Sequence, residues 1–476
     1  MSTRDLPSRP NLDQYRKQAK ELLKSWKAAD PETTRKLADA QHAIARDHGF
    51  ETWKRLTQEV VRRAGLSEKA AIWTSAEDAL VGGDDRTLAR LLREHEKMFR
   101  TEQPRSSWFG GLTPDYKVGD ARAIIARNHF FESWQQFAGF AAQLEYASSP
   151  VSRFERAVDA VVSGDAASIE RALTGHPELV RMRSARTHRA MLLHYVGANG
   201  VEGWRQRTPT NAVQIAELLL GAGAEVDATA DMYHGGCTTL GLIATSIHPK
   251  NAGLALPLID LFLSRGARID ALGAGNAHAL VNGCLANGRP EAAEYLARHG
   301  APLDLEAAAG VGWLDLVKSF FNPDGGLKPP ATASQLKDGF TWACEYGHTD
   351  IVEYLIDRGA DPGEAGRPHK ETGLHWAAFG GHVGTVKALL KRRPPLDVRD
   401  ASFDATPLGW AVHGWWDRRD EDAARREPYY EIVALLVAAG SPVEARWLSE
   451  DNASADPRMA AALSGKSRTA KKLRKS

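Results

Sequence analysis

The second half of the chain carries paired apolar segments that repeat at a regular interval. One copy reads TGLHWAAFGGH at 372–382 and continues with the apolar segment VKALL at 386–390. In the same register, Trp342, Trp376 and Trp410 are equally spaced along the chain. The paired small residues allow two short helices to approach closely, and the glycines before the histidine are typical of a helix end. The pattern therefore predicts successive helix–turn–helix units.

Weaker copies extend this register upstream and give about eight units between residues 151 and 447. The repeated motif resembles the ankyrin consensus T-P-L-H-x-A-A-x-x-G-H, which has a period of ~33 residues. That resemblance implies an all-α fold, an ankyrin-repeat solenoid in which stacking buries the apolar face that one unit cannot bury alone. It also implies recognition of a protein through the concave face, without catalysis.

Residues 1–150 are expected to form a helical N-terminal extension with a second, independent repeat. The stretch 39–53 recurs at 120–134 with nine of fifteen residues identical, and both copies contain the motif A-R-x-H-x-F-E-[S/T]-W. We interpret each copy as a helical hairpin. Apolar residues at helical spacing predict a helix before the first copy, with its inner face formed by Tyr15, Ala19, Leu22, Leu23 and Trp26.

The last segment, residues 448–476, loses the periodicity and ends in lysines and arginines. No acidic residue occurs among the final eleven positions. Because such a segment has little apolar surface to bury, we expect a disordered basic tail. Association with nucleic acid through this tail is the weakest of three functional hypotheses.

Composition narrows the classes of function. The 61 Lys+Arg residues balance the 60 Asp+Glu residues, which argues against a dedicated nucleic-acid binder. Three widely spaced cysteines cannot build a disulfide framework or a cysteine zinc site, as is common in a reducing compartment. No apolar run reaches the ~20 residues of a membrane span, and the N-terminus lacks the pattern of a signal peptide. We expect a cytoplasmic protein that uses no membrane, metal or cofactor.

The first candidate site is a register of aromatic and polar residues at equivalent positions of the units. Its members are Tyr195, Trp342, Trp376 and Trp410, followed one turn later by Glu345, Phe379 and His413. Rings aligned along an inner face offer a large apolar area at little entropic cost, as binding hot spots do. The leading hypothesis is therefore a non-catalytic scaffold that binds a protein partner there. The alternative is that the rings pack on one another between repeats.

The second candidate site depends on insertions between the two helices of a unit, one of them at 415–428. Insertions at equivalent junctions emerge on one side of a solenoid, where they can wall a pocket. The residues expected to line it are His194, Asn199, Glu202, Arg205, Asp231 and His248.

These side chains supply bases, acids and a guanidinium, so binding of a small molecule or acid–base catalysis is the alternative function. The competing interpretation is structural. A histidine at this position of the repeat commonly bonds the neighbouring turn, and an inserted Arg–Glu pair commonly orders its own loop. The sequence contains no H-E-x-x-H, C-x-x-C, phosphate-loop or nucleophile-elbow motif.

Overall fold

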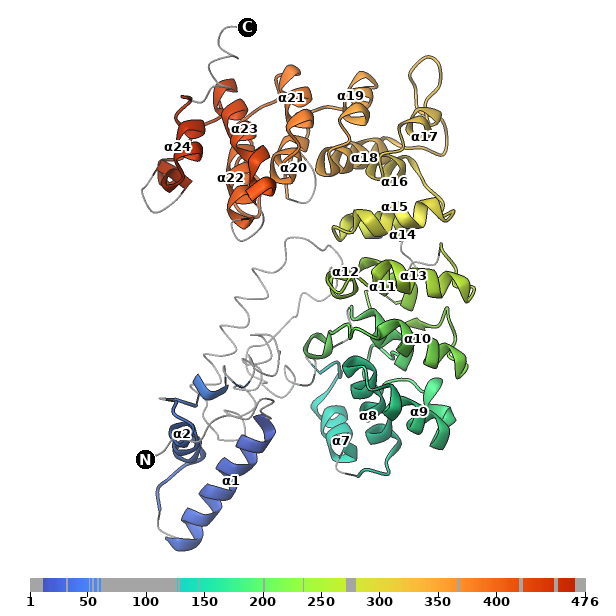
Figure 1. Cartoon of the computed structure of the whole chain (residues 1–476), viewed down its shortest axis with the longest axis vertical. Helices are drawn as coiled ribbons and strands as arrows, with labels where there is room; N and C mark the ends of the chain where they lie inside the picture. The colour runs from blue at the N-terminus through green and yellow to red at the C-terminus, as the bar shows by residue number, and fades with distance from the viewer. Residues whose placement is uncertain are drawn as a thin grey trace. The chain divides into compact units, whose positions relative to one another are not determined.

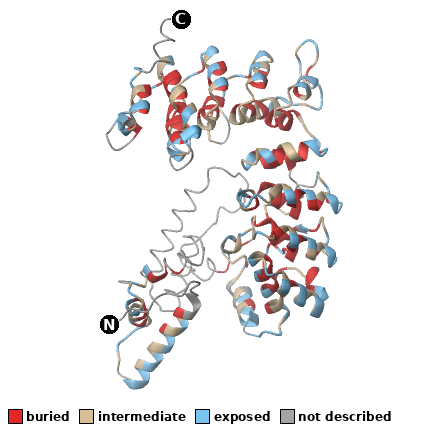
Figure 2. Ribbon diagram, in the orientation of Figure 1, coloured by how far each residue is buried: buried red, intermediate tan, exposed pale blue. Residues whose placement is uncertain are grey.

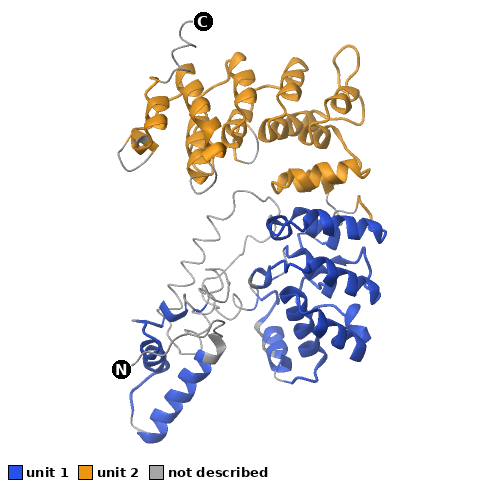
Figure 3. Cartoon of the chain, in the orientation of Figure 1, with its two compact units in different colours: residues 1–267, 273–275 blue, residues 268–272, 276–476 orange. Residues whose placement is uncertain are grey.

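The computed structural model describes residues 12–30, 33–50, 52–53, 55–57, 60, 126, 129–144, 146–199, 202–233, 235–270, 280–365, 369–418, 423–448 and 453–466. The described chain is mostly helical, which confirms the predicted all-α fold (Figure 1). It divides into two compact units (Figure 3). Unit 1 comprises residues 1–267 and 273–275, and unit 2 comprises residues 268–272 and 276–476.

Unit 1 contains the following described elements: α1 (Leu12–Ala29), α2 (Leu37–Asp47), α7 (Trp134–Leu144), α8 (Pro150–Ser163), α9 (Ala166–Gly175), the 3-10 helices η2 (Pro177–Val180), η3 (Leu192–Gly197) and η4 (Gly203–Arg205), α10 (Ala212–Gly221), β1 (Thr229–Ala230), β2 (Cys237–Thr238), α11 (Thr239–Thr245), α12 (Ile247–Asn251) and α13 (Ala255–Ser264). Three helix pairs follow one another, namely α8 with α9, η3 with α10, and α11 with α13. The first helix of each pair packs on the first helix of the next, and the second helices do the same. β1 and β2 form a short antiparallel ribbon before α11.

Local sequence explains where the first of these pairs begins and ends. Ser149 caps α8 by accepting a hydrogen bond from the amide of Ser152, and proline occupies the first helical position. The helix ends at Gly164, whose φ of 78° is left-handed and therefore suits glycine. Asp165 then caps α9 through the amide of Ser168. Because the glycine that ends α8 is followed directly by the aspartate that caps α9, the two helices are joined by a tight turn.

The repeat found in the N-terminal extension has a structural counterpart. In the first copy the amide of Phe50 bonds the carbonyl of Ala45 at 2.9 Å, and in the second the amide of Phe131 bonds the carbonyl of Ala126 at 2.8 Å. Between these partners, Gly49 and Phe130 both adopt a left-handed φ, of 80° and 64°. The described residues of the two copies therefore share this hydrogen bond and the left-handed position, which is a glycine in one copy and a phenylalanine in the other.

Unit 2 contains the following described elements: α14 (Leu280–Ala286), α15 (Pro290–Arg298), α16 (Leu305–Gly310), α17 (Leu314–Ser319), α18 (Ala333–Tyr346), α19 (Thr349–Asp357), α20 (Gly373–Gly380), α21 (Val383–Lys391), α22 (Pro407–Asp417), α23 (Ala423–Ala439), the 3-10 helices η5 (Ala445–Leu448) and η6 (Ala453–Ala455), and α24 (Pro457–Leu463). Five helix pairs run from α14–α15 to α22–α23, and each first helix packs on the next. Figure 2 shows buried positions concentrated on these first helices. One apolar core runs from α16 to α24.

Histidines at the glycine-histidine motif join successive units. The Nε2 of His348 bonds the carbonyl of Gly310 at 3.0 Å, and the Nε2 of His382 bonds the carbonyl of Glu345 at 2.7 Å. The two histidines occupy equivalent positions of successive units, so the same bond recurs with the repeat. Polar side chains thus fix the register that apolar stacking alone would leave free to slide.

Two segments differ from the sequence-based expectations. The insertion at 415–428 is expected to wall a pocket, but α22 continues to Asp417 and α23 begins at Ala423, so most of it lengthens two helices. Trp415 is 3% exposed and contacts Tyr430, which explains why the helices extend. The sequence also predicts disorder from residue 448. Instead α24 packs on α23 and buries Met459, because its apolar residues complete the core of unit 2. Residues 467–476 lie outside the described part of the chain.

Candidate functional site

Three consecutive first helices of unit 2 carry the predicted aromatic register. In α18, α20 and α22 the two residues after the tryptophan are buried in the core, as with Ala377 and Ala378. A side chain one position earlier on a helix lies about 100° away, at the edge of the buried face. Trp342 and Trp376 are half-buried there, whereas Trp410 is only 6% exposed. The three equivalent positions are therefore not equally accessible.

Trp410 is the centre of an aromatic cluster. Its ring lies 5.0 Å from Trp376, 5.8 Å from Phe379 and 6.5 Å from Phe403, each at a steep angle. Phe379 in turn stacks on His413 at 6.0 Å. We call these five residues the Trp410 cluster. Edge-to-face rings at such distances attract one another beyond their burial, so the cluster holds a defined shape.

A buried carboxylate fixes the tryptophan and the turn beside it. Asp400 accepts a hydrogen bond from the Nε1 of Trp410 at 3.0 Å and from the backbone amide of Phe403 at 2.7 Å. Burial raises the pKa of Asp400, but hydrogen bonds from Trp410 and three backbone amides outweigh it, so the pKa is lowered. The ionised carboxylate therefore braces the turn that displays Phe403.

The most exposed ring of the cluster is one that the sequence analysis missed. Phe403 is 62% exposed, on the turn before α22. A large apolar side chain in a polar turn, between Ser402 and Asp404, was the available signal. His413 is also exposed, while Trp376 and Phe379 are half-buried. Accessible rings thus surround a buried one.

The remaining predicted residues of this register, Trp342 and Glu345, belong to a different set of contacts. The ring of Trp342 stacks on Tyr346, and its Nε1 donates to Glu306 Oε1 of α16 at 2.8 Å. The carbonyl of Glu345 accepts the hydrogen bond from His382. Both residues lie at inter-repeat junctions next to the Trp410 cluster.

In unit 1, Tyr195 and two of the insert residues form a buried ion network. The hydroxyl of Tyr195 donates to Glu202 Oε1 at 2.6 Å, and Arg205 reaches both Glu202, at 3.0 Å, and Glu155, at 2.7 Å. Arg186 bonds Glu155 at 2.5 Å from the other side. Glu202 is fully buried, and Arg205 is 15% exposed.

The charges of this network balance one another. Burial raises the pKa of Glu202, but the imidazole of His188, 3.5 Å away, and the charges of Arg186 and Arg205 hold this pKa well below its usual range. Burial and the carboxylate of Glu202 raise the pKa of Tyr195. Both groups are thereby kept in one protonation state near neutral pH. The network therefore holds the insert residues Glu202 and Arg205 against Tyr195 and α8, which is a structural role.

His194 occupies a structural position as well. Its Nδ1 accepts from the amide of Met191 at 3.1 Å, and its Nε2 donates to the carbonyl of Ala228 at 3.0 Å. His375 of unit 2 makes the same pair of bonds, with the amide of Thr372 and the carbonyl of Ala405. Burial lowers the pKa of each histidine to about 4.

The other residues of the second candidate site are spread over unit 1. Asn199 donates to the Thr245 hydroxyl at 2.8 Å, and His248 contacts Gln206 at 3.2 Å. Asp231 is exposed on the turn between β1 and β2. Apart from Glu202 and Arg205, which share one ion network, the six residues make separate contacts, and the described contacts brace turns and the insert.

The described residues show no other chemical centre. No group of three or more His, Cys, Asp or Glu side chains among them is placed to hold a metal ion. In the same part of the chain, no helix combines the length and apolar character needed to cross a bilayer. The three cysteines are free thiols.

Comparison with known proteins identifies the repeats of unit 2. Residues 340–446 match the family model of ankyrin repeats (3 copies), which confirms the predicted resemblance for that stretch. A segment of 59 residues, 12% of the chain, is 41% identical to 2% of the E3 ubiquitin-protein ligase hecd-1 of Caenorhabditis elegans. A segment of 111 residues, 23% of the chain, is 32% identical to 3% of the E3 ubiquitin-protein ligase Ufd4 of Drosophila melanogaster. The chain thus spans a small fraction of these relatives. Ankyrin repeats serve in general as scaffolds for protein–protein interaction.

Proposed function

We propose that this chain is a non-catalytic scaffold that binds a protein partner through the Trp410 cluster of unit 2. The observation that carries the proposal is the arrangement of accessible rings, led by Phe403 at 62% exposure, around a buried and hydrogen-bonded Trp410. Binding hot spots are typically rigid aromatic side chains surrounded by residues that exclude water.

The rigidity of the cluster supports this function. Trp410 is held by Asp400, and Phe379 is held between Trp410 and His413. A surface whose rotamers are already fixed loses little conformational entropy when a partner docks. Arg418 lies over the ring of Phe379 at 5.5 Å and adds a positive charge at the border of the cluster. We therefore expect a partner with an apolar anchor and a nearby acidic group, met in the cytoplasm.

Site-specific photo-crosslinking tests the proposal. A benzophenone amino acid placed at His413 should capture a partner, whereas the same probe at Glu353 on α19, which is exposed and outside the cluster, should not. The captured protein is then purified, and its dissociation constant is measured with the wild-type chain and with Phe403→Ala. We expect at least a ~10-fold weaker complex for this variant. Equal capture from both probes, or an unchanged dissociation constant, would contradict the proposal.

Trp410 itself makes a poor test variant. Its removal leaves a large cavity and takes one hydrogen bond from the buried Asp400, so Trp410→Ala should destabilise unit 2 by about 3–5 kcal/mol. Loss of binding in that variant would report unfolding. Phe403→Ala avoids this problem because the ring is exposed.

A further inference from the structure

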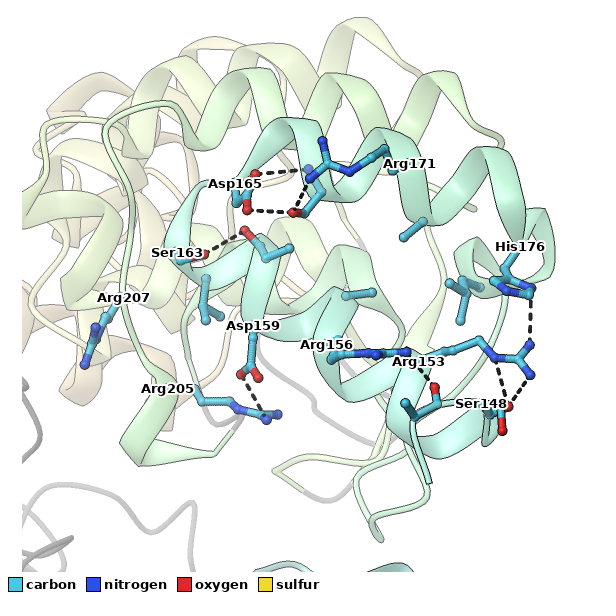
Figure 4. Close-up of a pocket in the computed structure, with 17 residues that line it drawn as sticks. Ser148, Arg153, Arg156, Asp159, Ser163, Asp165, Arg171, His176, Arg205 and Arg207 are labelled. Atoms are coloured by element: carbon cyan, nitrogen blue, oxygen red, sulfur yellow. Dashed lines mark hydrogen bonds and ion pairs between the residues drawn. The ribbon is translucent and has the colours of Figure 1, made fainter. Parts of the chain in front are cut away.

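A second surface, in unit 1, is built from different chemistry. A cleft of about 1050 Å³ runs along α8 and α9, and Figure 4 shows the side chains that line it. Five arginines contribute to its walls, namely Arg153, Arg156, Arg171, Arg205 and Arg207. Arg153 and Arg156 are three residues apart on α8, so they lie on one face of the helix.

The acidic residues of the cleft are engaged within the protein. Asp159 pairs with Arg205 at 3.1 Å. Asp165 caps α9 through the amide and the hydroxyl of Ser168. These two aspartates are the acidic side chains among the lining residues, and each already has a partner.

Two of the arginines donate hydrogen bonds to neutral groups and not to carboxylates. Arg156 donates to the carbonyl of Ala147 at 2.6 Å, and Arg171 donates to the hydroxyl of Ser168. Both side chains are exposed. Arg205 is paired with Asp159, Glu155 and Glu202, so the other four arginines face Asp165 along the walls and give the cleft a net positive charge.

Two of the five arginines are also positioned in advance. Arg153 is held by the carbonyl of Ser148 and by His176 Nδ1 at 3.2 Å. Arg205 is fixed at the inner border of the cleft by the buried carboxylates of Glu155 and Glu202. A guanidinium that is already oriented loses less entropy when it pairs with a carboxylate.

We infer that this cleft binds an acidic peptide segment of a protein partner, with aspartate or glutamate side chains paired to Arg156 and Arg171. Charge complementarity selects an anion, and planar guanidinium groups match carboxylates in a two-point geometry. The volume of the cleft lies just above the ~300–1,000 Å³ of small-molecule sites, which favours a chain segment over a single phosphate ion. The surface is separate from the Trp410 cluster, so the inference goes beyond the proposed function.

Fluorescence anisotropy with a labelled octaglutamate peptide and the full-length chain tests the inference. The double variant Arg156→Glu/Arg171→Glu should bind the peptide about tenfold or more weakly than the wild-type chain, because two attractive pairs become repulsive. The matched control is Arg181→Glu/Arg265→Glu, which makes the same change of charge at exposed positions of unit 1 outside the cleft. The control should change affinity less than about twofold, since exposed charges at a distance are largely screened by salt.

Three outcomes would overturn the inference. Equal losses in the two double variants would mean unspecific attraction by total charge. Equal binding of octaglutamine would mean that charge does not select the ligand. Displacement of octaglutamate by inorganic phosphate, or tighter binding of an eight-nucleotide single-stranded DNA, would mean that the cleft is a phosphate or nucleic-acid site. Phe403→Ala should bind octaglutamate as the wild-type chain does, so this test and the test of the Trp410 cluster fail independently.

Discussion

Tyr195 in unit 1 and Trp376 in unit 2 hold the same position of their repeats but differ in solvent exposure. Each follows a histidine that bonds its own helix start and the next turn. Tyr195 is nevertheless 2% exposed, whereas Trp376 is half-buried at the surface of the Trp410 cluster. The histidine hydrogen bonds are shared, but Tyr195 lies in the 3-10 helix η3 and Trp376 in the α-helix α20. The contacts around the two rings also differ.

The insertion after η3 covers Tyr195 together with the rings of Phe154 and His188. It places Glu202 on the hydroxyl of Tyr195 and Arg205 on Glu155, and the network closes over the ring. Glu202 adopts a left-handed φ of 47°, a strained value for a glutamate that its ionic contacts must sustain. Unit 2 has no such cover in the described residues around Trp376. We therefore expect the proposed recognition surface to lie on the repeat face that no insertion covers.

The largest effect that we expect is from removal of the carboxylate that covers Tyr195. Glu202→Ala removes one of the two buried carboxylates that pair with Arg186 and Arg205, so Glu155 alone remains buried against both guanidinium groups, and unit 1 should lose about 3–5 kcal/mol of stability. Urea unfolding gives the free energy, and hydrogen exchange locates the loss. As a control, Glu364→Ala removes a surface ion pair with Lys337 and should cost less than about 1 kcal/mol. Similar costs for both variants would refute a network that depends on burial.

Acid should weaken both units through the histidines that they share. Because the pKa of His194 and of His375 is about 4 in the folded chain, below the usual 6.5, the unfolded chain binds more protons between these values. Stability should therefore be unaffected above pH 7 and fall as pH drops from 6.5 to 4, by up to about 3 kcal/mol for each histidine. Urea unfolding at pH 7 and pH 4.5 measures the fall. His375→Asn should reduce it in unit 2 but not in unit 1.

A smaller effect is expected when only the hydroxyl of Tyr195 is removed. Tyr195→Phe deletes the bond to Glu202, which keeps Arg186 and Arg205 as partners, and should cost about 1–2 kcal/mol. Calorimetric unfolding measures the change. A neutral effect would mean that the insert closes over the ring by packing alone.

The smallest effect on stability is expected in unit 2, at the exposed ring of the Trp410 cluster. Phe403 is exposed, so Phe403→Ala should change the free energy of unfolding by less than about 0.5 kcal/mol while it weakens the partner complex. Thermal unfolding provides the measurement. A loss on the order of that seen for large-to-small changes in a core, about 3 kcal/mol or more, would show that Phe403 is part of the core of unit 2.

Much of the fold could be predicted because each repeat carries the same local sequence pattern. Small residue pairs and glycine-histidine ends identified the helix pairs of unit 2, and the repeat within the N-terminal extension pointed to a turn that both copies share. The candidate sites were less predictable. The sequence places Trp342, Trp376 and Trp410 in one register, but their exposure depends on Glu306, Asp400 and the turn at Phe403.

The sequence by itself determined the helical periodicity, the repeat and the helix ends marked by glycine, because these follow from interactions between residues a few positions apart. Tertiary structure alone decided which equivalent ring is buried, which charges meet and where arginines collect. Glu155 meets Arg205 across 50 residues, and Arg153 lies near His176 across 23. Pairings at such separations depend on how turns and insertions fold back on the helices. A local sequence pattern does not specify how these turns and insertions fold back.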